Sequence, residues 1–195
     1  MPNGKVLCVA GPVDGTAGSY LSPTFFFEFD PTTDTLARVP DAPNNTGAPF
    51  SGRMLLLPTG EVLFSNGSND IEAYAPDGVP QDAWRPLITD CPSDVQVGRS
   101  FTLSGTQLNG LSQAVSYGDD AQMATNYPIV RIVNNATGHV AYCQTSGHST
   151  MGVATGAAVH STNVQVPSTI ETGPSQLFVV ANGIPSAPVA VNVNP

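Results

Sequence analysis

The apolar residues of the chain fall in short runs that glycine, proline, asparagine, aspartate and serine separate. At residues 129–133 the odd-numbered side chains would face one way and the even-numbered ones the other, as in a half-buried β-strand. No stretch of three turns or more has apolar residues at helical spacing with a cap at each end. The pattern therefore predicts an all-β protein.

A weak internal repeat occupies the first part of the chain. Residues 1–7 match residues 57–63 in an apolar strand end, a Pro-x-Gly turn and a second strand. Residues 27–31 match residues 73–76 at an aromatic side chain and a proline, and a hairpin leads into a further strand at residues 36–39. This layout is typical of four-stranded propeller blades. Because propellers close with about four to eight blades, we expect the chain to be a fragment or other chains to supply blades.

A second pattern replaces the repeat near Trp84. It predicts two domains, a blade-containing one at residues 1–84 and a β-sandwich at residues 85–195. Seven short strands separated by turns, in about a hundred residues, fit an immunoglobulin-like sandwich. The predicted strands are residues 100–103, 114–117, 129–133, 139–143, 161–166, 176–181 and 189–193.

Six segments of the second half carry a family resemblance through their order and spacing. They are residues 97–99, 111–114, 117–118, 126–132, 164–167 and 177–186. With them, the chain resembles the end of galactose oxidase and its kelch-containing relatives, including glyoxal oxidase. The resemblance implies an incomplete set of kelch-type β-propeller blades followed by an immunoglobulin-like β-sandwich.

The resemblance also implies where copper ligands would stand. In this family two histidines and two tyrosines hold a copper ion, and one tyrosine is cross-linked to a cysteine. The alignment places Phe50 and Ser51 on one Tyr-His pair and Gln122 on the other histidine. Phenylalanine has no phenolate and serine has no imidazole, so neither could ligate Cu(II) as the family does. The cross-linked pair belongs to blades outside this chain. We therefore expect no catalytic residue and no cofactor.

Four further residues are candidates for a calcium site or a disulfide. Asp119 and Asp120 could bind Ca²⁺ with neighbouring carbonyl oxygens, or could form a turn in which Asp119 accepts backbone hydrogen bonds. Cys91 and Cys143 could form a disulfide across the sandwich or remain thiols, whereas Cys8 is expected to be a buried thiol. No site for another metal is predicted.

The remaining histidines and aromatic residues have structural interpretations. His148 lies in a Gly-His-Ser-Thr-Met-Gly segment that is one residue too long for a nucleophile elbow, and His139 and His160 stand alone in strand-like contexts. Phe25 and Phe27 would share one face of a strand buried on both sides. Glycosylation acceptor patterns begin at three positions, Asn44, Asn66 and Asn135.

The net charge of the chain limits the classes of partner that it could bind. The net charge is -9 with only six Lys and Arg, which argues against nucleic acid and anionic membranes because both need clustered cations. No apolar run is long enough for a membrane span. We expect a non-catalytic structural or adhesive module, secreted or at the cell surface, that contacts protein or glycan and can self-associate through open blade edges. The alternatives are the C-terminal part of a copper-radical oxidase and a carbohydrate-binding module.

Overall fold

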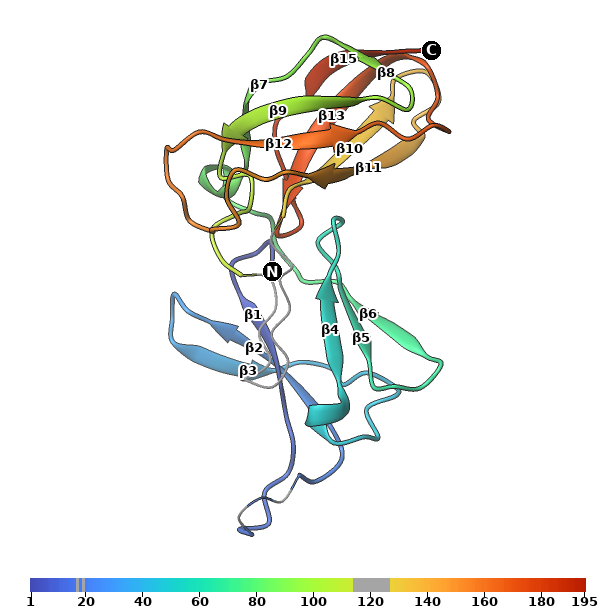
Figure 1. Ribbon diagram of the computed structural model, residues 1–195. Helices are drawn as coiled ribbons and strands as arrows, with labels where there is room; N and C mark the ends of the chain where they lie inside the picture. The colour runs from blue at the N-terminus through green and yellow to red at the C-terminus, as the bar shows by residue number, and fades with distance from the viewer. Residues whose placement is uncertain (17, 19, 114–126) are drawn as a thin grey trace. The chain divides into compact units, whose positions relative to one another are not determined.

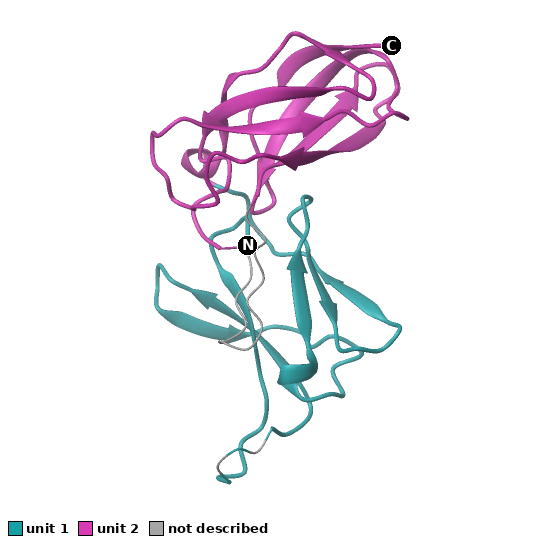
Figure 2. Cartoon of the chain, in the orientation of Figure 1, with its two compact units in different colours: residues 1–80 teal, residues 81–195 magenta. Residues whose placement is uncertain are grey.

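The computed structural model describes residues 1–16, 18, 20–113 and 127–195. Within these residues the regular elements are β-strands and two short 3-10 turns, η1 (Pro49–Ser51) and η2 (Asp82–Trp84), so the prediction of an all-β protein is confirmed. No helix in this part of the chain is long and apolar enough to cross a membrane. The chain separates into two compact units, residues 1–80 and 81–195 (Figure 2).

Unit 1 contains two antiparallel sheets of three strands each (Figure 1). The first sheet has the order β1 (Val6–Ala10), β2 (Phe25–Asp30), β3 (Thr35–Arg38). The second has the order β4 (Arg53–Leu56), β5 (Val62–Ser65), β6 (Ile71–Tyr74).

The predicted Pro-x-Gly turn joins β4 to β5. Gly60 has a φ of 93°, which a residue with a side chain rarely adopts, and its N–H donates to the carbonyl of Leu57 at 2.9 Å. The N–H of Leu57 in turn donates to the carbonyl of Glu61 at 2.8 Å. The turn thus sets the register in which Leu56 lies opposite Val62.

The middle strands supply the interior of unit 1. Phe26 of β2 and Phe64 of β5 are buried, and their rings meet edge to face with centroids 4.8 Å apart. The prediction that both faces of β2 are buried holds for Phe26 but was wrong for Phe25 and Phe27, which are only half-buried. Alternation places those two rings on the outer face, where the Arg38 guanidinium lies 4.0 Å from the centre of the Phe25 ring.

Unit 2 contains one large curled sheet. Its strands are, in sheet order, β7 (Leu87–Asp90), β9 (Ser100–Thr106), β12 (His160–Gln165), β11 (Val140–Ser146), β10 (Ile129–Asn134), β13 (Gly173–Ala181), β15 (Val189–Asn194) and β8 (Asp94–Gln96), with β14 (Ile184–Pro185) beside β13. Neighbouring strands are antiparallel except β15 and β8. The sheet bends along β11. The first part of this strand, Val140–Cys143, pairs with β10, and its last part, residues 144–146, pairs with β12.

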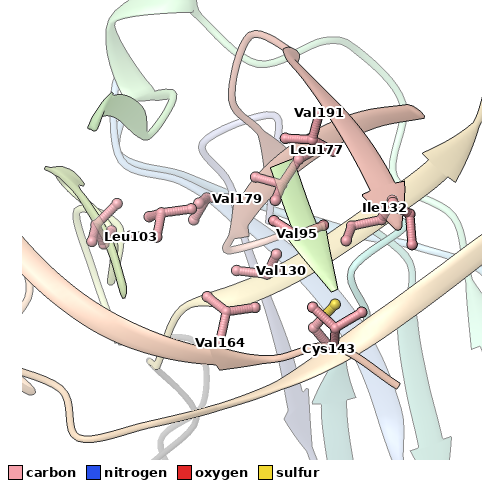
Figure 3. Packing of buried hydrophobic residues seen from close by; sticks show 12 residues of the cluster. Val95, Leu103, Val130, Ile132, Cys143, Val164, Leu177, Val179 and Val191 are labelled. Atoms are coloured by element: carbon pink, nitrogen blue, oxygen red, sulfur yellow. The ribbon is translucent and has the colours of Figure 1, made fainter. Parts of the chain in front are cut away.

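The curled sheet encloses a hydrophobic core (Figure 3). Alternate residues of each strand point inward, so Val130 and Ile132 of β10 are fully buried while Arg131 faces outward. The core consists of Val95, Leu103, Leu108, Val130, Ile132, Cys143, Val164, Val166, Leu177, Val179, Val191 and Val193.

Six of the seven strands predicted for the second half overlap observed ones. The seventh, at residues 114–117, lies outside the described residues. Strands β7, β8 and β14 were not predicted, because each has only two to four residues and lies near prolines, and so shows little alternation. The predicted boundary after residue 84 falls at the end of η2, which belongs to unit 2.

Candidate functional site

The outer strands of the two small sheets form the first candidate surface. In the described part of unit 1, strands β1, β3, β4 and β6 each pair with a neighbour on one side only. Each also exposes one large hydrophobic side chain, whereas the large hydrophobic side chains of the middle strands are buried or half-buried. The exposed residues and their exposed fractions are Val6 (50%), Leu36 (60%), Leu55 (47%) and Ile71 (64%). We call these four strands the open edges.

The open edges differ in charge. Strand β3 contains Arg38, β4 contains Arg53 and β6 contains Glu72, whereas the five residues of β1 are Val, Leu, Cys, Val and Ala. Charged side chains are a common means by which proteins discourage strand pairing at a sheet edge. The β1 edge therefore has the least protection against a further strand.

A buried carboxylate joins the two small sheets. Glu28 of β2 accepts a hydrogen bond from Lys5 Nζ at 2.8 Å and another from Tyr74 Oη of β6 at 2.8 Å. Burial would raise the pKa of Glu28, but these hydrogen bonds outweigh burial and lower it. Burial and the bond to Glu28 raise the pKa of Tyr74 to about 12. These contacts tie Lys5, the residue before β1, and Tyr74 of β6 to β2, while within the described residues β1 pairs with β2 alone.

A hollow of about 420 Å³ on unit 2 forms the second candidate surface. Residues of β10 and β11 line it together with residues 167 and 169–171. Ile132, Ala141 and Ile170 provide apolar lining, and Tyr142, an exposed residue, also lines the hollow. An aromatic ring beside polar groups is suited to contact a sugar or a peptide.

An exposed histidine and a carboxylate stand at this hollow. His139 Nδ1 lies 2.8 Å from Glu171 Oε1, and Thr137 donates a hydrogen bond to Glu171 Oε2 at 2.5 Å. The bonds from Thr137 and His139 lower the pKa of Glu171. Both side chains are exposed to solvent, so the pair offers hydrogen-bonding groups to a ligand.

The positions aligned with copper ligands do not fit copper. Phe50 and Ser51 lie in η1, where the Phe50 ring packs edge to face against Tyr20 with centroids 5.6 Å apart. Ser51 donates a hydrogen bond from its hydroxyl to the carbonyl of Ala48 at 2.7 Å. Gln122 lies outside the described residues. Phenylalanine offers no ligand atom, so the two described positions cannot supply the family's tyrosine and histidine.

The other metal candidates gain no support from the described residues. Asp119 and Asp120 lie outside them. Within them, no three His, Cys, Asp or Glu side chains gather closely enough to hold a metal ion. His148 has a packing role, since its Nδ1 lies 2.9 Å from Thr162 Oγ1 and its ring stacks on Tyr127.

All three cysteines are free thiols in the structure. The possible Cys91–Cys143 disulfide is therefore not formed, although both residues belong to or pack against the same core. Cys143 lies within the paired part of β11, whereas Cys91 follows β7 and its Sγ lies 3.6 Å from the carbonyl of Pro92. Burial, with Asp90 adding to it at Cys91, raises the pKa of Cys91 to about 11, and burial raises that of Cys143 to about 12.

The glycosylation acceptor patterns differ in their surroundings. The amide of Asn44 donates to the carbonyl of Asp70 at 3.0 Å, and the amide of Asn66 donates to the carbonyl of Asn44. Both amides therefore help to hold unit 1 together. The side chain of Asn135 is exposed in the turn between β10 and β11, which makes it the most accessible acceptor of the three.

Sequence reasoning missed the residues that make both surfaces. Leu36 and Leu55 resembled ordinary strand residues, and Ile71 was expected in a loop, whereas the structure places it in β6. Only the pairing shows that all three lie on edge strands. Glu171 drew no attention because it is 32 residues from His139. The charge along each strand was a usable signal, because it separates β1 from the other open edges.

Comparisons with known proteins do not assign the chain to a family. No protein-family model matches the chain, and no curated protein matches it. Among solved structures, the Lin-41 filamin domain is similar with a TM-score of 0.32 and 10% sequence identity, over 56% of this chain and 91% of that one.

Proposed function

We propose that the chain is a non-catalytic structural β-module that associates with copies of itself through the open edges of unit 1. The observation that carries this proposal is the coincidence of one-sided pairing with an exposed large hydrophobic side chain on each of four strands. An edge strand leaves N–H and C=O groups without strand partners, and another strand can satisfy them. The exposed side chains would be buried in the same step, which adds a hydrophobic contribution.

The internal repeat supports the same proposal. It matches β1 with β5 and β2 with β6, although β1 is an edge strand and β5 a middle strand. On a kelch-type blade plan, the first sheet would hold strands two to four of one blade, and the second sheet strands one to three of the next. A strand from another chain would then complete a blade. Unit 2 would be an immunoglobulin-like sandwich, and the acidic, lysine-poor composition suits a secreted or surface location.

Native mass tests the proposal. Light scattering of the purified chain over a range of micromolar concentrations is expected to show an oligomer whose population rises with concentration. Replacing Val6, Leu36, Leu55 and Ile71 together by lysine should shift the chain to monomer. The matched control replaces Val13 and Val79, which are exposed but lie outside strands. A folded wild-type chain that stays monomeric throughout would refute self-association.

A second candidate function is adhesion to a glycan or protein through the hollow of unit 2. The exposed Tyr142, which lines the same hollow as the His139–Glu171 pair, favours it. Binding to a glycan array that is lost in Tyr142→Ala and kept in Tyr20→Ala would support a carbohydrate-binding module. Absence of binding to every glycan tested would leave protein contacts as the adhesive role.

The enzymatic alternative is the C-terminal part of a copper-radical oxidase. It has the least support, because Phe50 and Ser51 stand where the resemblance calls for a tyrosine and a histidine. Titration with Cu(II), followed by electron paramagnetic resonance, is expected to show no tight stoichiometric site. Tight binding that depends on residues of this chain would favour the oxidase alternative.

A further inference from the structure

We propose that two copies of the chain join through an antiparallel β1–β1 pairing centred on Cys8, which makes one continuous sheet across a two-fold axis. This inference rests on the proposed self-association and specifies which open edge is used, in which direction and in which register. Three observations carry it: the absence of charge along β1, the direction of its free backbone groups and the position of Cys8.

The backbone groups of β1 can be assigned to one edge or the other. The N–H of Val39 donates to the carbonyl of Phe26 at 3.1 Å, so Phe26 directs its carbonyl toward the side of β3. Successive residues of a strand direct their N–H and C=O groups to opposite edges. Phe27 therefore directs its N–H and C=O groups toward β1. Cys8 lies opposite Phe27 and therefore bonds to β2.

The residues on either side of Cys8 direct their backbone groups to the opposite edge of β1. Leu7 and Val9 direct their N–H and C=O groups away from β2, to the open edge. In an antiparallel pairing centred on Cys8, Leu7 of one copy lies opposite Val9 of the second copy, and Val9 opposite Leu7. Both are hydrogen-bonded pairs, so the four free backbone groups on each strand are satisfied together. This register satisfies the edge groups of Leu7 and Val9 symmetrically, while the Lys5 carbonyl, next along the same edge, already accepts a hydrogen bond from the Met1 ammonium at 2.8 Å.

Side-chain charge permits this pairing. Val6 of one copy would lie opposite Ala10 of the second copy, so no like charges meet within the strand. The nearest charged side chain, Lys5, is already paired with Glu28 at 2.8 Å and would lie opposite Gly11. Strands β3, β4 and β6 each contain a charged residue, and charge on an edge strand discourages the addition of a further strand. A second copy of β1 is thus the occupant that the β1 edge fits.

The register makes a geometric prediction about Cys8. The two Cys8 residues would face each other as a non-hydrogen-bonded pair, in which Cα atoms lie about 4.5 Å apart. Disulfides span Cα distances of roughly 4.4–6.8 Å, so the pair is within cross-linking range. Mild oxidation with copper–phenanthroline should therefore link two chains at Cys8. Cys8→Ser should abolish the covalent dimer while Cys91 and Cys143 remain in place.

Charge exchange tests the register without relying on the thiol. In the double variant Val6→Glu, Ala10→Glu, two pairs of carboxylates would face each other, and we expect the dissociation constant to rise about fivefold or more. In Val6→Glu, Ala10→Lys, opposite charges would face each other and the dimer should be kept. Both variants place two charges on the exposed face of β1, so each controls for the other's effect on folding.

The outcomes separate this inference from the proposed function. A dimer in light scattering, linked through Cys8 and sensitive to the sign of the charge at residue 10, supports both. An oligomer that shows neither the Cys8 link nor the charge dependence overturns the β1 pairing and leaves self-association through another edge. A folded monomer at all concentrations overturns both.

Discussion

The carboxylate of Glu28 accepts a hydrogen bond from the hydroxyl of Tyr74 at 2.8 Å, although the two residues are 46 positions apart. Glu28 belongs to the first small sheet and Tyr74 to the second, so this bond ties the two sheets together. Because the carboxylate is buried, loss of either partner would leave a polar group without compensation.

Removal of the Tyr74 hydroxyl should therefore destabilise unit 1. We expect Tyr74→Phe to lower the free energy of opening by about 1–2 kcal/mol, since the lost bond is to a charged group. Hydrogen exchange of peptides that cover β2 and β6 would measure this. Tyr142→Phe, on an exposed tyrosine of unit 2, is the matched control and should change little. Equal exchange in all three proteins would mean that the bond contributes no stability.

The pKa of Glu28 predicts a dependence of stability on pH. Burial tends to raise this pKa, but the bonds from Lys5 and Tyr74 outweigh it, so the folded-state pKa lies below the ordinary 4.5. A group of this kind stabilises the fold above its unfolded-state pKa and loses that contribution as the pH falls through the folded-state value. Between about pH 6 and pH 3, unit 1 of the wild type should lose more stability than unit 1 of Glu28→Gln. Parallel pH curves in denaturant titrations would contradict the role assigned to Glu28.

The buried thiols of unit 2 should be slow to react. With the pKa of Cys91 near 11 and that of Cys143 near 12, only about a thousandth or less of either is thiolate at neutral to mildly alkaline pH. We expect native-state alkylation to label Cys8 first, and unfolding without a reductant to expose all three thiols. A single reactive thiol after unfolding would show instead that Cys91 and Cys143 form a disulfide in solution.

The close contact between β7 and β9 depends on Gly105. A Cβ atom there would stand 2.2 Å from the backbone oxygen of Leu87 and 2.8 Å from Leu108 Cδ2. The backbone at Leu87 or Gly105 would have to move to make room for this atom. We therefore expect Gly105→Ala to destabilise unit 2 by about 1–3 kcal/mol. Chemical denaturation followed by the fluorescence of Trp84 would report this. Gly152→Ala, whose nearest neighbour would be the Thr150 hydroxyl at 3.3 Å, is the control and should unfold near the wild-type midpoint.

Much of the secondary structure could be predicted from local pattern. Alternation of apolar and polar residues located β10, and the Pro-x-Gly turn located the hairpin of β4 and β5. These signals are short-range, because side-chain direction in a strand and the φ of a turn glycine depend on a few neighbouring residues. The shortest strands, such as β8, have too few residues to show alternation and were missed.

Local sequence is enough to establish that the chain is all-β, where most strands lie and which strand contains no charged residue. Strand pairing in three dimensions is what makes β1 an edge, although its sequence matches the middle strand β5. It also decided that Glu28 meets Tyr74 and that His139 meets Glu171. The physical reason is that strand pairing joins residues far apart in the chain, so local pattern determines a strand's faces but not its neighbours.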